Sequence, residues 1–178
     1  QINQMNQIAC WPNHTTETYN RPMLLVVDIG NTNIVWGVYD DRSLAAHWRI
    51  ATDVKKTSDE YGILFANLLA AAGIPTQRLT GAVISCVVPA LTGTVEQMLE
   101  QYFCQRPLVV TSDMDTGLTI RYDNPKEIGS DRLVNAAAAY HKYRRDLIVV
   151  DFGTATTFCA ITAEGQYLGG VIAPGLGI

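Results

Sequence analysis

The chain has 178 residues, of which 48% are hydrophobic and only 17% charged, and its formal net charge is −4. This composition suits one ordinary domain, or one and a half small ones, with a packed core, and it excludes intrinsic disorder. Without a basic stripe it also disfavours nucleic acid as a partner, because neutralising phosphates needs clustered Lys and Arg. No apolar run reaches the roughly 18 residues that span a bilayer, so we expect no membrane segment.

Residues 1–22 are rich in Gln and Asn and lack the basic-then-apolar layout of a secretion signal. We interpret them as a disordered tail or a non-native extension. The four cysteines of the chain are too few for a disulfide scaffold and too widely spaced for a metal knuckle. We therefore expect reduced thiols and a cytoplasmic protein.

Residues 23–51 predict a meander of strands at 23–27, 34–39 and 44–50. The first is a continuous aliphatic run, which is typical of a strand buried on both faces. Thr57 and Glu60 form a capping box that opens a helix ending near Gly73. Strands at 82–88 and 108–110, with a helix at 91–102 between them, complete the order βββαβαβ.

After a looser segment at 111–128 and a helix at about 131–143, the pattern restarts. Residues 147–153 match residues 24–30 at a constant offset of 123, and five of the seven positions are identical. Further strands follow at 157–161 and 167–172. A duplicated strand-turn-strand indicates two similar halves. We predict an α/β fold in which 23–145 form the first half and 146–178 the incomplete start of the second.

Each copy of the repeat places an aspartate, Asp28 or Asp151, at the end of a buried strand, where a carboxylate needs a partner or a cation. A glycine two residues later lets backbone N–H groups approach an anion. Two such hairpins facing each other could hold a nucleotide triphosphate and its Mg²⁺. For one isolated copy a plain turn would be the simpler reading, but the duplication favours the phosphate site.

Five motifs in this order resemble the type III pantothenate kinases, in the superfamily that includes actin, Hsp70 and sugar kinases, over roughly residues 23–178. They are Asp28–Thr32, Tyr122–Pro125, Gly129–Arg132 with Asn135, Asp151–Thr157 and Gly169–Gly175. The resemblance implies a duplicated ribonuclease H-like fold, a mixed sheet with flanking helices. It further implies ATP-dependent phosphorylation of pantothenate, the first step of coenzyme A synthesis, by cytoplasmic homodimers that need Mg²⁺ and K⁺ or NH₄⁺.

The resemblance also assigns roles to residues. Asp131 would be the proton acceptor, Asp151 the ligand of the monovalent cation and Asp28, less directly, a ligand of Mg²⁺. The implied pantothenate contacts are Tyr122, Gly129, Ser130, Asp131 and Arg132. The implied ATP contacts are Asp28, Ile29, Gly30, Asn31, Thr32, Asn33, Ile34, Val35 and Thr154. Cys159 stands where many members have Asp, so the role of this position is open.

Several alternatives remain at this point. Asp131 or Ser130 could simply cap the following helix, and Arg132 could clamp a substrate carboxylate or make a surface ion pair. Another phosphotransferase of the same superfamily, or a nucleotide-binding accessory regulator, would share the two Asp-x-Gly hairpins.

Overall fold

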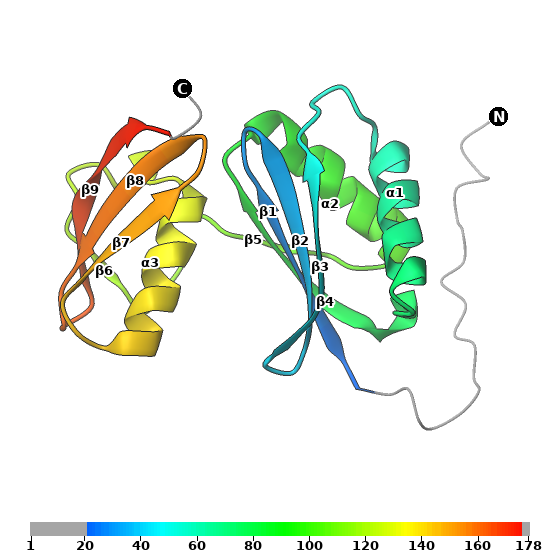
Figure 1. The fold of residues 1–178 in the computed structure, drawn as a ribbon, viewed down its shortest axis with the longest axis horizontal. Coiled ribbons are helices and arrows are strands. Elements are labelled where there is room, and N and C mark those ends of the chain that lie inside the picture. Colours follow the sequence, from blue (N-terminus) through cyan, green and yellow to red (C-terminus); the bar gives the residue numbers. More distant parts are fainter. Residues whose placement is uncertain (1–20, 176–178) are drawn as a thin grey trace.

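The computed structural model describes residues 21–175, which form two lobes, each built on its own sheet (Figure 1). The expected tail at 1–22 lies almost entirely outside the described residues. The strand order is β3-β2-β1-β4-β5 in the first sheet and β6-β9-β8-β7 in the second. In both sheets a meander of three antiparallel strands forms one side, so the predicted duplication is present in the topology as well as in the sequence.

The first lobe follows the predicted order βββαβαβ. Strand β4 pairs in parallel with β1 of the meander, and β5 pairs in parallel with β4. The elements are β1 (Met23–Ile29), β2 (Asn33–Asp40), β3 (Ser43–Ala51), α1 (Ser58–Ala71), β4 (Leu79–Cys86), α2 (Pro89–Phe103) and β5 (Leu108–Val109), with a short 3₁₀ turn η1 (Thr76–Arg78) before β4.

Helix α1 begins at the predicted capping box. The Glu60 backbone N–H donates to Thr57 Oγ1 over 3.3 Å, and the Thr57 N–H donates to Glu60 Oε2 over 2.8 Å. The helix is followed by Gly73 at φ +67°, a conformation that glycine adopts without a steric penalty. Phe65 of α1 stacks on Trp36 of β2 with ring centroids 4.4 Å apart, which anchors the helix to the sheet.

Strand β1 differs from its prediction, because only one of its faces is fully buried. Leu25, Val27 and Ile29 lie in the core beneath α1 and α2, whereas Leu24 on the opposite face is 42% exposed. The aliphatic run indicates a strand correctly. It does not reveal that both helices pack on the same face of the sheet (Figure 1).

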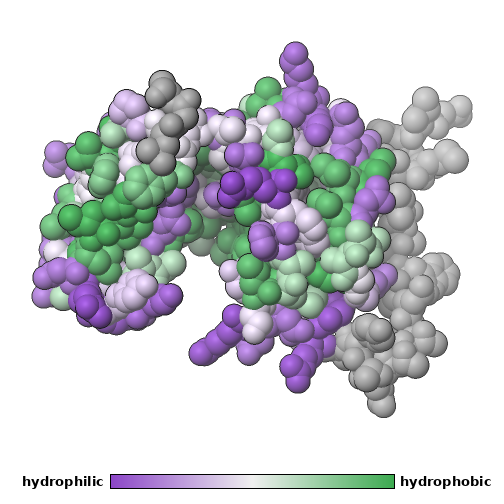
Figure 2. Space-filling model, in the orientation of Figure 1, coloured by the Kyte–Doolittle hydropathy of each residue, from purple (hydrophilic) through white to green (hydrophobic). Residues whose placement is uncertain are grey.

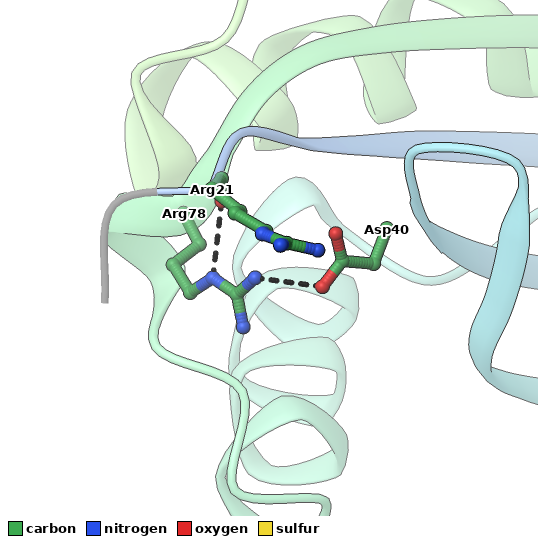
Figure 3. Close-up of polar contacts among 3 residues, drawn as sticks. All are labelled: Arg21, Asp40 and Arg78. Carbon is green, nitrogen blue, oxygen red and sulfur yellow. Dashed lines mark hydrogen bonds and ion pairs between the residues drawn. The ribbon is translucent and has the colours of Figure 1, made fainter. Parts of the chain in front are cut away.

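Arg78 ties the beginning of the described chain to the first sheet. Its Nε donates to the carbonyl oxygen of Arg21 over 3.1 Å, and its Nη2 donates to Asp40 Oδ2 over 2.9 Å (Figure 3). An ion pair this close to the surface adds little stability, so its main effect is to fix the path of the chain into β1.

The second lobe consists of β6 (Thr119–Ile120), the 3₁₀ turn η2 (Pro125–Glu127), α3 (Ser130–Tyr143), β7 (Leu147–Phe152), β8 (Ala155–Ile161) and β9 (Gln166–Pro174). The sequence did not predict β6, which is only two residues long and pairs in parallel with β9. Helix α3 covers one face of this sheet, with Leu133 and Tyr140 against Ile161 and Tyr167. The boundary between the two predicted halves, at residues 145 and 146, stays a prediction. It assigns α3 to the first half, whereas α3 packs on the second sheet.

The other face of the second sheet is apolar and open. We call it the uncovered face; its residues are Ile148, Val150, Phe152, Phe158 and Val171, all of them exposed. Figure 2 shows a continuous hydrophobic patch on this lobe.

Two of the cysteines, Cys86 and Cys159, are free thiols as expected. Cys104 is disulfide-bonded, so the expectation of four reduced thiols is wrong at this position. None of the helices within residues 21–175 is both long and apolar enough to cross a membrane.

Candidate functional site

The two duplicated hairpins meet between the lobes. Thr32 in the β1–β2 loop and Thr154 in the β7–β8 loop share a hydrogen bond of 2.6 Å between their hydroxyl oxygens. The chain therefore brings together two copies of one motif that lie 122 residues apart at this contact. In Figure 1 both loops lie at the same end of the two sheets.

The two loops differ in length. Ile29 pairs with Ile34 across the first hairpin, which leaves residues 30–33 in the loop, whereas Phe152 pairs with Thr156 and leaves residues 153–155. The glycine N–H closes each loop by donating over 3.0 Å, from Gly30 to the Asn33 carbonyl and from Gly153 to the Ala155 carbonyl. The second hairpin is thus one residue tighter, so the constant offset of the sequence repeat ends at the turn.

Thr52, at the end of the meander, braces the first loop. Its hydroxyl donates to the Gly30 carbonyl over 2.6 Å, and its backbone N–H donates to the Thr32 carbonyl over 3.0 Å. The carbonyl oxygens of Gly30 and Thr32 thereby each accept a hydrogen bond from Thr52, which holds the loop in one conformation.

Three carboxylates converge at this end of the molecule. Desolvation raises the pKa of Asp28 above its ordinary value of 3.8; a hydrogen bond with the Ser85 side chain lowers it, and the charges of Asp131 and Asp151 raise it again. Asp28 on β1 is therefore within range of the charges of Asp131 on α3 and Asp151 on β7. A cation between such groups would relieve their repulsion.

The predicted cation sites, Mg²⁺ at Asp28 and a monovalent cation at Asp151, depend on carboxylate donors. Carboxylate oxygens are the ligands that Mg²⁺ prefers, so the residue types suit a hard cation. Within the described residues, however, no group of three or more His, Cys, Asp and Glu side chains is arranged closely enough to hold a metal by itself.

Asp151 also has a neutral partner. Asn135, one turn into α3, donates from Nδ2 to Asp151 Oδ2 over 3.0 Å. An amide donor fixes one carboxylate oxygen without neutralising the charge, so the carboxylate can still attract a cation.

Hydrogen bonds of the Ser130 hydroxyl anchor the beginning of α3 to the first lobe. Its hydroxyl accepts from the Cys86 N–H over 2.9 Å, donates to the Cys86 carbonyl over 3.0 Å, and lies 3.2 Å from the Ser85 hydroxyl. Ser130 is buried and its hydroxyl is fully engaged, so its side chain is a link between the lobes.

The capping alternative for Ser130 and Asp131 is wrong, because the N-cap residue of α3 is Gly129 and no side chain caps the helix. Asp131 Oδ1 instead accepts from the neighbouring Arg132 N–H over 2.7 Å. A Cβ atom on Gly129 would lie 2.5 Å from the same oxygen. The glycine therefore provides the space in which the Asp131 carboxylate lies.

Arg132 makes no surface ion pair, since it is only 7% exposed and bonds to no carboxylate within the described chain. Its Nε donates to Cys159 Sγ over 3.3 Å, while its Nη2 is buried without a partner there. Burial lowers the pKa of Arg132, but the hydrogen bond to Cys159 and nearby Tyr167 and Tyr122 raise it overall, so the guanidinium stays cationic.

The residues implied to contact pantothenate and ATP therefore differ in how accessible they are to a ligand. Ile29 and Ile34 are fully buried in the first core, so their side chains cannot contact a ligand. Tyr122 is half-buried and packs against the second core, close to Gly169. Sequence reasoning missed Ser85, Cys86 and Tyr167, which carry no motif of their own and reach the site only through tertiary contacts.

Comparison with known proteins agrees with this arrangement. Residues 24–178 match the type III pantothenate kinase family. The chain is 54% identical over 154 residues to the type III pantothenate kinase of Geobacter sulfurreducens and 56% identical over 154 residues to that of Geotalea daltonii, covering 86% of this chain in each case. It spans 60% of the length of either relative.

Among solved structures, a reductive activator for a corrinoid, iron-sulfur protein superposes on this chain with a TM-score of 0.54. The identity is 12%, and the match covers 83% of this chain and 30% of the other. At that identity the likeness concerns the fold alone, and it supports the predicted α/β architecture of mixed sheets with flanking helices. The match along 24–178, the identity to both relatives and the duplicated hairpins together place the chain in the type III pantothenate kinase family.

Proposed function

We propose that the full-length protein transfers the γ-phosphoryl group of ATP to the primary hydroxyl of pantothenate, the first step of coenzyme A synthesis. One observation carries the proposal: the two Asp-x-Gly hairpins meet at Thr32 and Thr154, and Asp28 of the first hairpin is within range of the charges of Asp131 and Asp151. Phosphoryl transfer needs this combination of a phosphate cradle, a cation site and a carboxylate base.

In this mechanism residues 28–35, which include the first loop, and Thr154 hold the phosphates of ATP through backbone N–H and hydroxyl groups. Asp131 accepts the proton of the attacking hydroxyl, and its carboxylate has room to do so beside Gly129. Tyr122 and Arg132 would hold pantothenate, with the buried guanidinium facing its carboxylate.

Mg²⁺, when bound, would offset the charge that develops on the phosphates, and Asp28 is the residue we assign to it. We assign K⁺ or NH₄⁺ to Asp151, whose carboxylate Asn135 orients. On the same family ground we infer a cytoplasmic homodimer with pantothenate and ATP as substrates.

A coupled assay of ADP release by the full-length protein, with and without pantothenate, tests the activity. Release that depends on pantothenate supports the proposal. Release that does not depend on pantothenate would indicate transfer of the phosphoryl group to water by a hydrolase. ATP binding without release would indicate an accessory regulator or a phosphotransferase for another acceptor.

The cation assignment is tested with Asp151→Ala. Loss of the ligand should flatten the dependence of the rate on K⁺ concentration, while the dependence on Mg²⁺ keeps its shape. Asp28→Ala serves as the matched variant and should alter the Mg²⁺ dependence instead. An unchanged K⁺ response in Asp151→Ala would refute the assignment.

A further inference from the structure

A buried polar cluster lies between α3 and the second sheet. It consists of Arg132 from α3, Cys159 from β8 and Tyr167 from β9, of which Cys159 and Tyr167 are 2% and 0% exposed. Arg132 Nε and the Tyr167 hydroxyl each donate to Cys159 Sγ over 3.3 Å. The sulfur is thus the common acceptor of two buried donors, a more specific role than filling space in the core.

The contact at Nε leaves one end of the guanidinium unsatisfied. Arg132 Nη2 is buried and has no hydrogen-bond partner in the described part of the chain. A buried cationic donor is costly without an acceptor, and the guanidinium group is planar, so fixing Nε also fixes the direction of Nη2. The arrangement fits an anionic group of a ligand as the missing acceptor.

The β9 backbone opposite Cys159 leaves room for this guanidinium. Cys159 pairs with Gly170 in the β8–β9 ladder, so both positions face α3. A Cβ atom on Gly170 would lie 2.5 Å from Arg132 Nη2, and one on Gly169, at φ +129°, would lie 3.1 Å from the Tyr122 ring. The glycine pair and Cys159 together determine where Arg132 and Tyr122 lie.

We propose that Cys159 is a positioning residue of the substrate site: its sulfur holds the Arg132 guanidinium through Nε so that Nη2 faces the carboxylate of pantothenate. Tyr167 steadies the sulfur from the other side and does not touch the substrate. The inference rests on the proposed function, because it takes the ligand of Nη2 to be the carboxylate of that substrate.

Cys159→Ala in the full-length protein removes the acceptor. Because one hydrogen bond from a charged donor is lost and the guanidinium can rotate, the KM for pantothenate should rise about tenfold, while kcat and the KM for ATP stay within about twofold. Cys159→Asp, which offers a carboxylate acceptor to the same guanidinium, should bring the KM for pantothenate back to within about threefold of wild type.

Ile161→Val is the matched control, since Ile161 is buried on the same strand and the same face and the change removes one methylene without touching the polar cluster. It should leave all three kinetic parameters near wild type. A rise in the KM for pantothenate as large as that of Cys159→Ala would overturn the proposal, because packing alone would then account for the effect.

A double variant tests whether Cys159 acts through Arg132. Arg132→Lys keeps the charge but lacks the Nε donor, so adding Cys159→Ala to it should change the KM for pantothenate by less than about twofold. Full additivity would reject the positioning role.

The Nε–H resonance of Arg132 in ¹⁵N-labelled protein reports the contact without turnover. It should be protected from solvent exchange in wild type and lose that protection in Cys159→Ala. A protected resonance in a wild-type protein without pantothenate-dependent turnover would reject pantothenate as the substrate. An unprotected wild-type resonance would reject the contact with the sulfur, whatever the activity.

Discussion

Asp131 has what a general base requires at the scale of a single residue. Its carboxylate occupies space that Gly129 leaves open, it bonds to the adjacent Arg132 N–H, and it interacts electrostatically with Asp28 across the lobes. Because no helix-capping bond uses this side chain, removing its charge should affect chemistry more than folding.

We predict that Asp131→Asn lowers turnover by roughly 10² to 10⁴, the usual contribution of a positioned base, and leaves ATP affinity nearly unchanged. The amide keeps the shape and the acceptor for the Arg132 N–H but cannot take a proton. Steady-state kinetics and nucleotide titration of the full-length protein measure the two effects. Retention of more than about half of the wild-type turnover would reject the base assignment.

Asp28 should lower the stability of the protein at neutral pH when no cation is present. Desolvation raises its pKa above 3.8, the Ser85 hydrogen bond opposes this, and Asp131 and Asp151 add to it, so folding disfavours the charged form. A carboxyl with a raised pKa contributes its full stability below about 3.8, the unfolded value, and this contribution is lost as pH rises through the folded pKa.

Asp28→Asn should therefore unfold at a higher temperature than wild type at pH 7 in EDTA, and the difference should vanish as pH falls toward 3.8. Thermal unfolding across this pH range is the measurement. Asp41→Asn, in the exposed turn between β2 and β3, removes the same charge away from the acids and corrects for the change in net charge. A less stable Asp28→Asn protein at pH 7 would show that the acids do not repel one another.

At the scale of secondary structure, the two helices α1 and α3 are held at their N-termini in different ways. Helix α1 has a complete capping box, whereas α3 begins at a glycine and is held instead by the Ser130 hydroxyl on β4. Helix α1, which carries no site residue, is capped by residues of its own sequence. The helix that carries Asp131 is anchored to the other lobe, as a site built between two lobes requires.

Thr57→Ala should destabilise the protein by about 1 kcal/mol, because it removes the acceptor for the Glu60 N–H at the start of α1. Denaturant unfolding measures the change. Thr57→Ser keeps the hydroxyl and should stay within about 0.5 kcal/mol of wild type. Equal losses in both variants would mean that the box does not contribute through this hydrogen bond.

At the scale of the whole molecule, the two sheets are covered differently. Two helices bury one face of the first sheet, while the second has α3 on one side and the uncovered face on the other. Ile148, Phe152 and Val171 are each more than half exposed there, and Figure 2 shows an apolar patch on this lobe. A patch of this kind favours association with another apolar surface.

The chain of residues 1–178 should therefore self-associate in solution. Val171→Lys on the uncovered face should reduce the association, because a charge there opposes burial of the strand. Leu44→Lys is the control, since Leu44 is 48% exposed on β3 of the first sheet. Light scattering measures the association, and a monomeric chain of residues 1–178 would contradict the prediction.

The sequence alone determined the order of the elements, the capping box, the duplication and the family, because these depend on periodicity, turn residues and motifs that are local in the chain. It could not show the two-residue strand β6, which carries too few residues for a pattern, nor that β1 is covered on one face only. Only the tertiary structure brought Asp28, Asp131 and Asp151 together, anchored Ser130 on Cys86, and buried Arg132 against Cys159. Such contacts join residues far apart in the chain, so their distances are set by how the lobes pack and by no local pattern.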